Sequence, residues 1–180
     1  QQDWPDEHEK RVATRLQEIL KENSQFHNDS ERALCIKAYF EEIIANGDIH
    51  YLLRDKNLEL VNLLFKAPRD CRKPFALKIL QRHFRDMHAA NILLFVAFID
   101  SKTDSHWRLR LLNERFNTLE TSHIEDCIRS LPDKELKKYA SRILDQRFDE
   151  LNTYHLITLI AVTKETEQKK WLARLLQNKK

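Results

Sequence analysis

The stretch WRLRLLNERF at residues 107–116 is one of four related segments, which begin at intervals of 32 residues. The other three are FALKILQRHF from Phe75, YASRILDQRF from Tyr139 and WLARLLQNKK from Trp171. Each segment starts with an aromatic residue, has a basic residue three positions later and then has two branched apolar residues in succession. A constant interval of this size is typical of proteins that are built from stacked structural repeats.

The apolar residues of each segment predict a helix with a wide buried face. The first three segments end on an aromatic residue, at Phe84, Phe116 and Phe148. Together with the leading aromatic and the branched pair, this residue makes an apolar arc of about 180° on a helix. A second stretch between the segments, such as ILLFVAFI at 92–99, has apolar residues at i, i+3, i+4 and i+7 and predicts another helix.

Helix boundaries are marked by cap residues and prolines. Thr121 and Thr153 are predicted N-caps, and acidic residues in first turns support the same boundaries. Prolines at helix edges or in first turns are Pro68, Pro74 and Pro132. The acidic residues in first turns are Asp133 and Glu165.

We predict one helical-repeat domain, 1–180, which begins with a capping helix at 1–28. This helix opens at Pro5 and has one apolar stripe, Val12, Leu16, Ile19 and Leu20. Four helical hairpins follow, and a terminal helix covers 165–180. The hairpins span 29–68, 69–100, 101–132 and 133–164, and the first contains a loop insertion around Asn46-Gly47.

The fold class that this order predicts is all-α, an α-solenoid of antiparallel helical hairpins with a 32-residue repeat. The layout of residues 30–180 resembles HEAT-like and tetratricopeptide-like α-solenoids. The resemblance rests on the period and on the hairpin pattern. The tetratricopeptide motif W-x2-L-G-x2-Y is absent, since Arg-Leu-Arg follows Trp107.

Composition limits the classes of function. The chain of 180 residues has 42% apolar residues but only one Gly and four Pro, which leaves little material for hairpin turns or Gly-rich phosphate loops. With 31 basic and 28 acidic residues, the net charge is +3. A dedicated nucleic-acid domain is usually much more basic.

The cysteines and the apolar runs predict a protein of a reducing compartment. Cys35, Cys71 and Cys127 are odd in number and form no CxxC pair, so a disulfide framework or a zinc site is not expected. The longest apolar run, at 92–99, is far shorter than the roughly 20 residues that span a bilayer. We therefore expect an intracellular location, cytoplasmic or nuclear, without membrane insertion.

The basic residue at the fourth position of each segment forms a row, Lys78, Arg110, Arg142 and Arg174. These side chains lie opposite the apolar arc and are predicted to point to solvent. In a stack of helices they would make a ladder about 30 Å long that could bind an acidic peptide or a phosphate backbone. Alternatively, each cation covers the aromatic ring three residues before it and needs no ligand.

Other recurring polar residues favour structural roles. A second basic column, at His83, Arg115, Arg147 and Lys179, lies near the ends of the first helices, where cations meet free carbonyls or form buried ion pairs. His123 and His155 share one position with Asn91 and are predicted to act at helix starts rather than as metal ligands.

The sequence contains no pattern that supports an active site. Gly-rich nucleotide loops, zinc-protease helices and nucleophile elbows are absent. Cys127 follows His123 by four residues but takes an apolar core position, and the adjacent Glu125 and Asp126 diverge by about 100° on a helix. We predict a non-enzymatic protein with no catalytic or metal site, no cofactor and no small-molecule substrate.

The segment ANILLFVAFID, residues 90–100, is apolar almost all round. Its extra apolar residues are either covered by the N-terminal insertion, which we favour, or exposed for a partner.

The function predicted from these features is a protein-interaction scaffold. Its repeat surface would bind a partner helix or an acidic peptide, and Lys78, Arg110, Arg142 and Arg174 are the predicted acidic contacts. The alternative is binding of RNA or another nucleic acid along the same row. An enzyme built on helical repeats is the third possibility.

Overall fold

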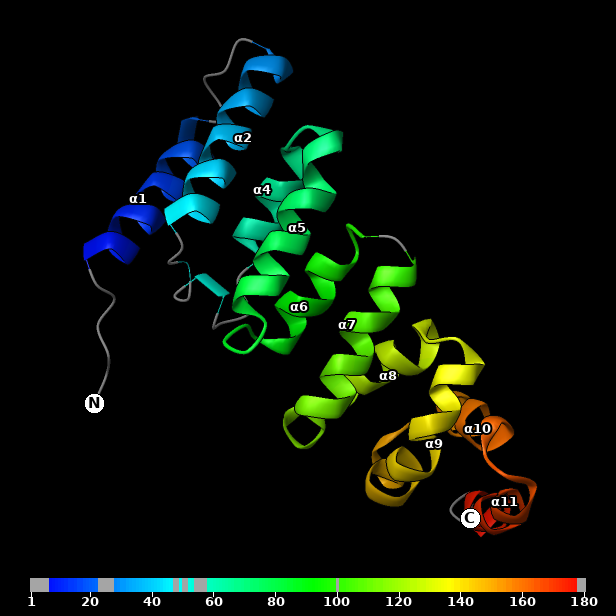
Figure 1. Ribbon diagram of the computed structural model, residues 1–180. Helices are drawn as coiled ribbons and strands as arrows, with labels where there is room; N and C mark the ends of the chain where they lie inside the picture. Colours follow the sequence, from blue (N-terminus) through cyan, green and yellow to red (C-terminus); the bar gives the residue numbers. More distant parts are fainter. Residues whose placement is uncertain are drawn as a thin grey trace. The chain divides into compact units, whose positions relative to one another are not determined.

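A computed structural model describes residues 7–22, 28–46, 49, 52–53, 58–99 and 101–177. These residues form helices and no strand, which confirms the all-α class for this part of the chain. The chain divides into two compact units, Gln1–Asp100 and Ser101–Lys180 (Figure 1). Within each unit the helices pack against one another.

The first unit is built around helix α2. Its helices are α1 (Glu7–Glu22), α2 (Asp29–Asn46), α4 (Glu59–Lys66), α5 (Arg69–His83) and α6 (Ala89–Val96). Helix α2 packs against α1, α4 and α5, and α6 packs against α4 and α5. Leu16 and Ile19 of α1 are fully buried, which confirms these two residues of the predicted N-terminal stripe.

The second unit is built around helix α10. The chain runs through α7 (Ser101–Glu114), the 3₁₀ turn η1 (Phe116–Thr118), α8 (Thr121–Ser130), α9 (Asp133–Arg147), the 3₁₀ turn η2 (Phe148–Glu150), α10 (Thr153–Val162) and α11 (Glu165–Gln177). Helix α10 packs against α8, α9 and α11, and α7 packs against α8. Figure 1 shows these helices in yellow-green to red.

The N-caps of α8 and α10 differ by one residue from the prediction. The cap of α10 is Asn152, whose Oδ1 accepts the backbone N–H of His155 at 3.1 Å. The cap of α8 is Glu120. The predicted caps Thr121 and Thr153 are wrong, because both threonines are already the first residues of their helices and the side chain before each occupies the cap position.

The second correction concerns Pro74. Helix α5 begins at Arg69, directly after its N-cap Pro68, so Pro74 lies inside the helix and not at an edge or in the first turn. A proline inside a helix removes one backbone hydrogen bond and costs about 3 kcal/mol. Burial of Phe75 and Ala76, the next two residues of α5, offsets this cost.

The predicted core positions of the related segments are buried with two exceptions, since Tyr139 is half-buried and Leu176 is exposed. The branched pairs 79–80, 111–112 and 143–144 are buried, as are the three phenylalanines that end these segments. In the last segment Leu175 is buried but Leu176 is 69% exposed, so the core prediction is wrong for Leu176. Helix α11 packs against α10, and Leu176 lies on a side that α10 does not cover.

The start of helix α6 is bonded to Leu53, which precedes α4 in the chain. The carbonyl of Leu53 accepts a hydrogen bond from Asn91 Nδ2 at 3.0 Å and another from the backbone N–H of His88 at 2.8 Å. Leu53 itself is buried, whereas Leu93 and Leu94 of α6 are half-buried. The extra apolar residues of this helix are not fully covered as predicted, since Ala97 is exposed and Phe98 is half-buried as well.

Several predictions concern residues outside the described part of the chain. They are Pro5 at the opening of the first helix, the insertion at Gly47 and Lys179 in the second basic column. The side chains of Val12 and Leu20 are likewise outside it. These predictions stay as they were made.

Candidate binding surface

The basic row is divided between the two units. Lys78 belongs to α5 of the first unit and is exposed. Arg110, Arg142 and Arg174 belong to α7, α9 and α11 of the second unit, and all three are half-buried. Arginines in the second unit are therefore less open to solvent than a helical wheel predicts.

Aromatic rings account for this partial burial. The guanidinium carbon of Arg142 lies 4.2 Å from the ring centroid of Phe116, and that of Arg174 lies 4.3 Å from Phe148. In both pairs the arginine reaches the 3₁₀ turn that follows the preceding long helix. The distance from the Arg110 guanidinium to the Trp107 ring is 5.7 Å.

The ring-covering prediction is therefore confirmed for Arg110 and Arg174, and for Arg142 the ring is a different one. Arg110 and Arg174 lie over the aromatic residue three positions earlier, the latter at 5.9 Å from Trp171. Arg142 was expected over Tyr139 but lies over Phe116. A flat guanidinium over a ring face gains about 0.5 to 1 kcal/mol at partly exposed sites.

Carboxylates and a carbonyl accept hydrogen bonds from the same three arginines. Arg110 Nε donates to Glu114 Oε1 at 2.6 Å, and Arg174 Nη2 donates to Asp149 Oδ2 at 2.8 Å. Arg142 Nη1 donates to the backbone carbonyl of Leu112 at 3.4 Å. Each guanidinium thus has a protein partner in addition to a ring. The Arg142 contact joins α9 to α7, and the Arg174 contact joins α11 to η2.

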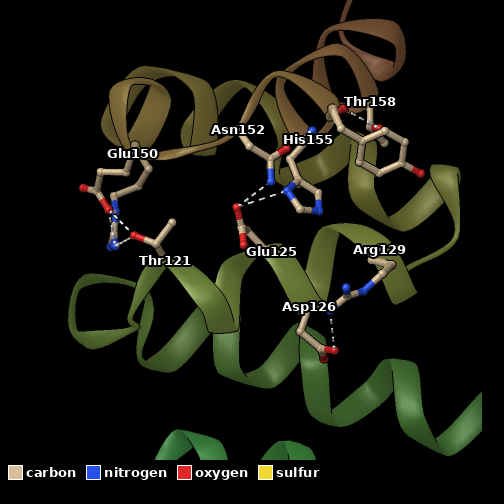
Figure 2. Close-up of polar contacts among 10 residues, drawn as sticks. Thr121, Glu125, Asp126, Arg129, Glu150, Asn152, His155 and Thr158 are labelled. Carbon is tan, nitrogen blue, oxygen red and sulfur yellow. Dashed lines mark hydrogen bonds and ion pairs between the residues drawn. The ribbon is translucent and has the colours of Figure 1, made fainter.

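The second basic column contains a well-connected arginine. Arg147 Nη2 donates to the backbone carbonyl of Leu119 at 3.0 Å, and Arg147 Nε donates to Glu150 Oε2 at 2.7 Å. Thr121 Oγ1 donates to the same oxygen of Glu150 at 2.7 Å (Figure 2). The predicted carbonyl contact is found for Arg147, although the carbonyl belongs to the preceding turn, and its ion pair with Glu150 is not buried. His83 in this column is buried.

Hydrogen bonds from Thr121 and Arg147 also determine how Glu150 titrates. Donation by these two groups lowers the pKa of the Glu150 carboxyl, because both bonds favour its ionised form. Glu150 is exposed, so water screens the pair and its energy is modest.

A polar junction joins the starts of α8 and α10. Asn152 Nδ2 donates to Glu125 Oε1 at 3.0 Å, and His155 Nδ1 lies 3.2 Å from the same oxygen (Figure 2). His123 Nδ1 accepts the backbone N–H of Glu120 at 3.3 Å. The predicted helix-start role is thus confirmed for the His123 side chain. The side chain of His155 contacts Glu125 of α8 instead, and this contact could not be read from the sequence.

The neighbouring carboxylate points elsewhere, as predicted. Asp126 Oδ2 accepts from Arg108 Nε at 3.1 Å, and Asp126 Oδ1 accepts from Arg129 Nη2 at 3.5 Å. Arg108 is buried and also pairs with Asp104 on its own helix. This arginine ties α7 to α8, and no sequence signal singled it out.

Cys127 is fully buried, which confirms its place in the core. Burial raises the pKa of the Cys127 thiol to about 12. The thiolate needed for nucleophilic chemistry is therefore strongly disfavoured. Among the described residues, no three His, Cys, Asp or Glu side chains lie close enough to hold a metal ion.

A groove of about 610 Å³ runs between α7 and α9 in the second unit. Arg110 lies in its lining together with His106, Glu114, Glu135, Lys138 and Tyr139. Lys138 Nζ donates to Glu135 at 2.7 Å, and Tyr139 Oη donates to Asn113 at 2.8 Å. The groove brings one residue of the basic row together with other polar groups of mixed charge.

A larger pocket of about 880 Å³ lies between α1 and α2 in the first unit. Its charged lining is balanced between three basic and three acidic residues, Lys10, Arg11, Arg15, Glu7, Glu18 and Glu42. Burial, with Glu42 and Glu59 nearby, raises the pKa of the Tyr39 hydroxyl at this pocket. Balanced charge gives the pocket no preference for an anion or a cation.

The last two described helices expose large apolar residues. Tyr154 and Ile157 of α10 are 69% and 52% exposed, and Leu172 and Leu176 of α11 are 45% and 69% exposed. These are four of the seven exposed large apolar residues in the described part. Sequence reasoning missed this surface, because the pattern placed Leu176 in the core and gave no reason to expose the others.

No protein-family model, curated protein or solved structure matches this sequence. No helix among the described residues is both long and apolar enough to cross a membrane. The function is therefore argued from the geometry of the exposed surfaces.

Proposed function

We propose that the chain is a non-enzymatic protein-interaction scaffold that binds a partner helix or an acidic peptide. The observation that carries the proposal is the apolar surface of α10 and α11, where Tyr154, Ile157, Leu172 and Leu176 are exposed. Large apolar residues that are exposed together are typical of protein-binding surfaces, whereas single ones are common on any protein.

The scaffold in this proposal is an α-solenoid with a 32-residue repeat. Support comes from the helix starts, since α5, α7, α9 and α11 begin at residues 69, 101, 133 and 165. Helices α6, α8 and α10 begin at residues 89, 121 and 153, which gives the same interval. Stacked helical pairs of this kind present extended surfaces to partners.

Within the scaffold the basic row has two roles. Arg142 and Arg174 stabilise the stack, because each lies over the phenylalanine of the preceding turn. Arg110 lies in the groove between α7 and α9, where an acidic side chain of a partner would compete with Glu114 for its guanidinium. Lys78 is exposed and open to the same kind of contact.

Selection from a peptide-display library on the immobilised full chain tests the proposal. We expect enrichment of peptides that combine a helical apolar stripe with acidic residues. Enriched peptides are then titrated against wild type and against Arg110→Glu, with Lys134→Glu as a control at an exposed position of α9. Weaker binding to Arg110→Glu alone would assign the acidic contact to the groove.

The RNA-binding alternative predicts a different result. No peptide would be enriched, and single-stranded RNA would bind with an affinity that falls steeply as salt is added. That pair of outcomes would contradict the scaffold proposal.

A further inference from the structure

Helix α9 shows how a long helix of the second unit is covered. Its Ala140 and Leu144 are fully buried. Helix α10, which follows α9 in the sequence, packs against it. At the same places 32 residues later, α11 has Leu172 and Leu176, which are 45% and 69% exposed. The side of α11 that corresponds to the covered side of α9 is thus open.

Helix α8 shows how a short helix of this unit is covered. Its Glu125 accepts a hydrogen bond from Asn152 and lies 3.2 Å from His155, both from the start of α10 (Figure 2). The residue of α10 that is 32 positions after Glu125 is Ile157, and it is 52% exposed beside the exposed Tyr154. The side of α10 that corresponds to the covered side of α8 is open as well.

Both open sides are the ones that a single further helix would cover. Helix α10 packs against both α8 and α9. A helix placed one interval further, with the same relation to α10 and α11, would cover Ile157 on one and Leu172 and Leu176 on the other. One additional helix, packed against both α10 and α11, would therefore account for all four exposed apolar residues.

We propose that α10 and α11 form a docking seat for one acidic amphipathic helix of a partner protein. The inference rests on the proposed scaffold function and names its partner. The partner helix would pack on α10 and α11 in the way that α10 packs on α8 and α9. Its length would match that of α8 and α10, which have 10 residues each. Such a helix is about 15 Å long.

The chemistry of the seat selects the sequence of the helix. Ile157 stands where α8 has a glutamate, so the residue that meets it is apolar and not an asparagine or histidine. Residues 153–180 contain six basic and two acidic residues, a difference of four positive charges. Lys164 and Lys169 beside the seat are exposed, so acidic residues on the flanks of the helix are favoured.

A labelled helical peptide measures this binding by fluorescence anisotropy. The peptide has leucines at i, i+3, i+4 and i+7 and glutamates on both flanks, and a scrambled peptide of equal composition is its control. We expect saturable binding to the full chain. Ile157→Lys and Leu176→Lys should each weaken it about tenfold or more, because a lysine would be buried in an apolar contact.

Matched variants distinguish binding at the docking seat from nonspecific binding. Leu34→Lys replaces an apolar residue on α2 that is 63% exposed, and it should leave binding unchanged. Lys164→Glu combined with Lys169→Glu should weaken binding about threefold and reduce its salt dependence. All replaced side chains are exposed, so circular dichroism should show wild-type folding and thermal midpoints.

Four results would overturn the docking seat. Equal binding of the scrambled peptide, or binding that Ile157→Lys and Leu34→Lys affect alike, would mean that no specific seat exists. Self-association of the free chain in sedimentation velocity, abolished by Ile157→Lys, would make a second copy the occupant. Display peptides that bind wild type and Ile157→Lys equally would overturn the seat but retain the scaffold function, whereas failure of the scaffold function would leave no peptide bound at all.

Discussion

Helices α9 and α11 share two apolar places, 140 and 144 in α9 and 172 and 176 in α11, that only α9 buries. Ala140 and Leu144 of α9 are fully buried, whereas Leu172 and Leu176 of α11 are 45% and 69% exposed. Helix α10 follows α9 and packs on it, and α11 is the last helix of the described part. The pattern of a helix thus defines which side chains can be buried, and a neighbouring helix decides which of them are.

The largest effect on the free energy of unfolding is expected at the two phenylalanines over which arginines of α9 and α11 lie. Phe116 lies under Arg142, and Phe148 lies under Arg174 and stacks with Trp171 at 5.6 Å between ring centroids. Phe116→Ala and Phe148→Ala should each lower the free energy of unfolding by about 3 to 5 kcal/mol, because both rings are buried. Urea denaturation measures this loss. A loss for Phe148→Ala near zero would show that α11 is not held against η2.

The next prediction compares α9 and α11 directly. Leu144→Ala should lower the free energy of unfolding by about 2 to 5 kcal/mol, because it leaves a cavity in a filled core. Leu176→Ala, at the corresponding place in α11, should change it by less than about 0.5 kcal/mol. Chemical denaturation of both variants under one set of conditions checks the difference. Equal losses would contradict the exposure of Leu176.

Arg142 allows a sharper test of the link between successive long helices. Arg142→Leu should lower the free energy of unfolding by about 0.5 to 1 kcal/mol, since it removes the contact with Phe116 and the bond to the Leu112 carbonyl. Lys78→Leu is the control, because Lys78 has the same place in α5 but is exposed. A double-mutant cycle with Phe116→Ala isolates the ring contact. Full additivity would indicate that the two side chains do not interact.

The smallest expected effect is the pH dependence that Glu150 adds. Its pKa is lowered in the folded chain, so the unfolded state takes up a proton first as the pH falls. The stabilisation by Glu150 is therefore complete above the ordinary glutamate pKa of about 4.3 and is lost as the pH falls through the lowered value. Unfolding of wild type and Glu150→Gln between neutral and acidic pH measures it. A difference that grows on acidification would contradict the sign.

Side chains that depend on one helix alone were predictable from the sequence. Trp107, Phe116 and the branched pair at 111–112 are buried as expected, because the i, i+3, i+4 spacing puts them on one helical face. The position of Cys127 in the core follows from the same spacing. Helix starts were less predictable, since Thr153 and Asn152 before it are both plausible caps by type.

Contacts between helices were only partly predictable. The ring beneath Arg110 is on its own helix and was expected, but Arg142 lies over Phe116 and not over Tyr139. A long side chain reaches both its own helix and its neighbour, and the sequence does not contain the distance between helices. The contact of His155 with Glu125 was missed for the same reason.

The sequence by itself determined an all-α chain, the order of its helices and most of the faces that are buried. These features depend on local hydrogen bonding and on periodic apolar residues, both of which are written along one helix. Only the tertiary structure decided that Arg142 lies over Phe116 and that Leu172, Leu176 and Ile157 stay exposed. Burial and pairing depend on which neighbour lies within contact distance, and that is a property of the packed helices and not of any one of them.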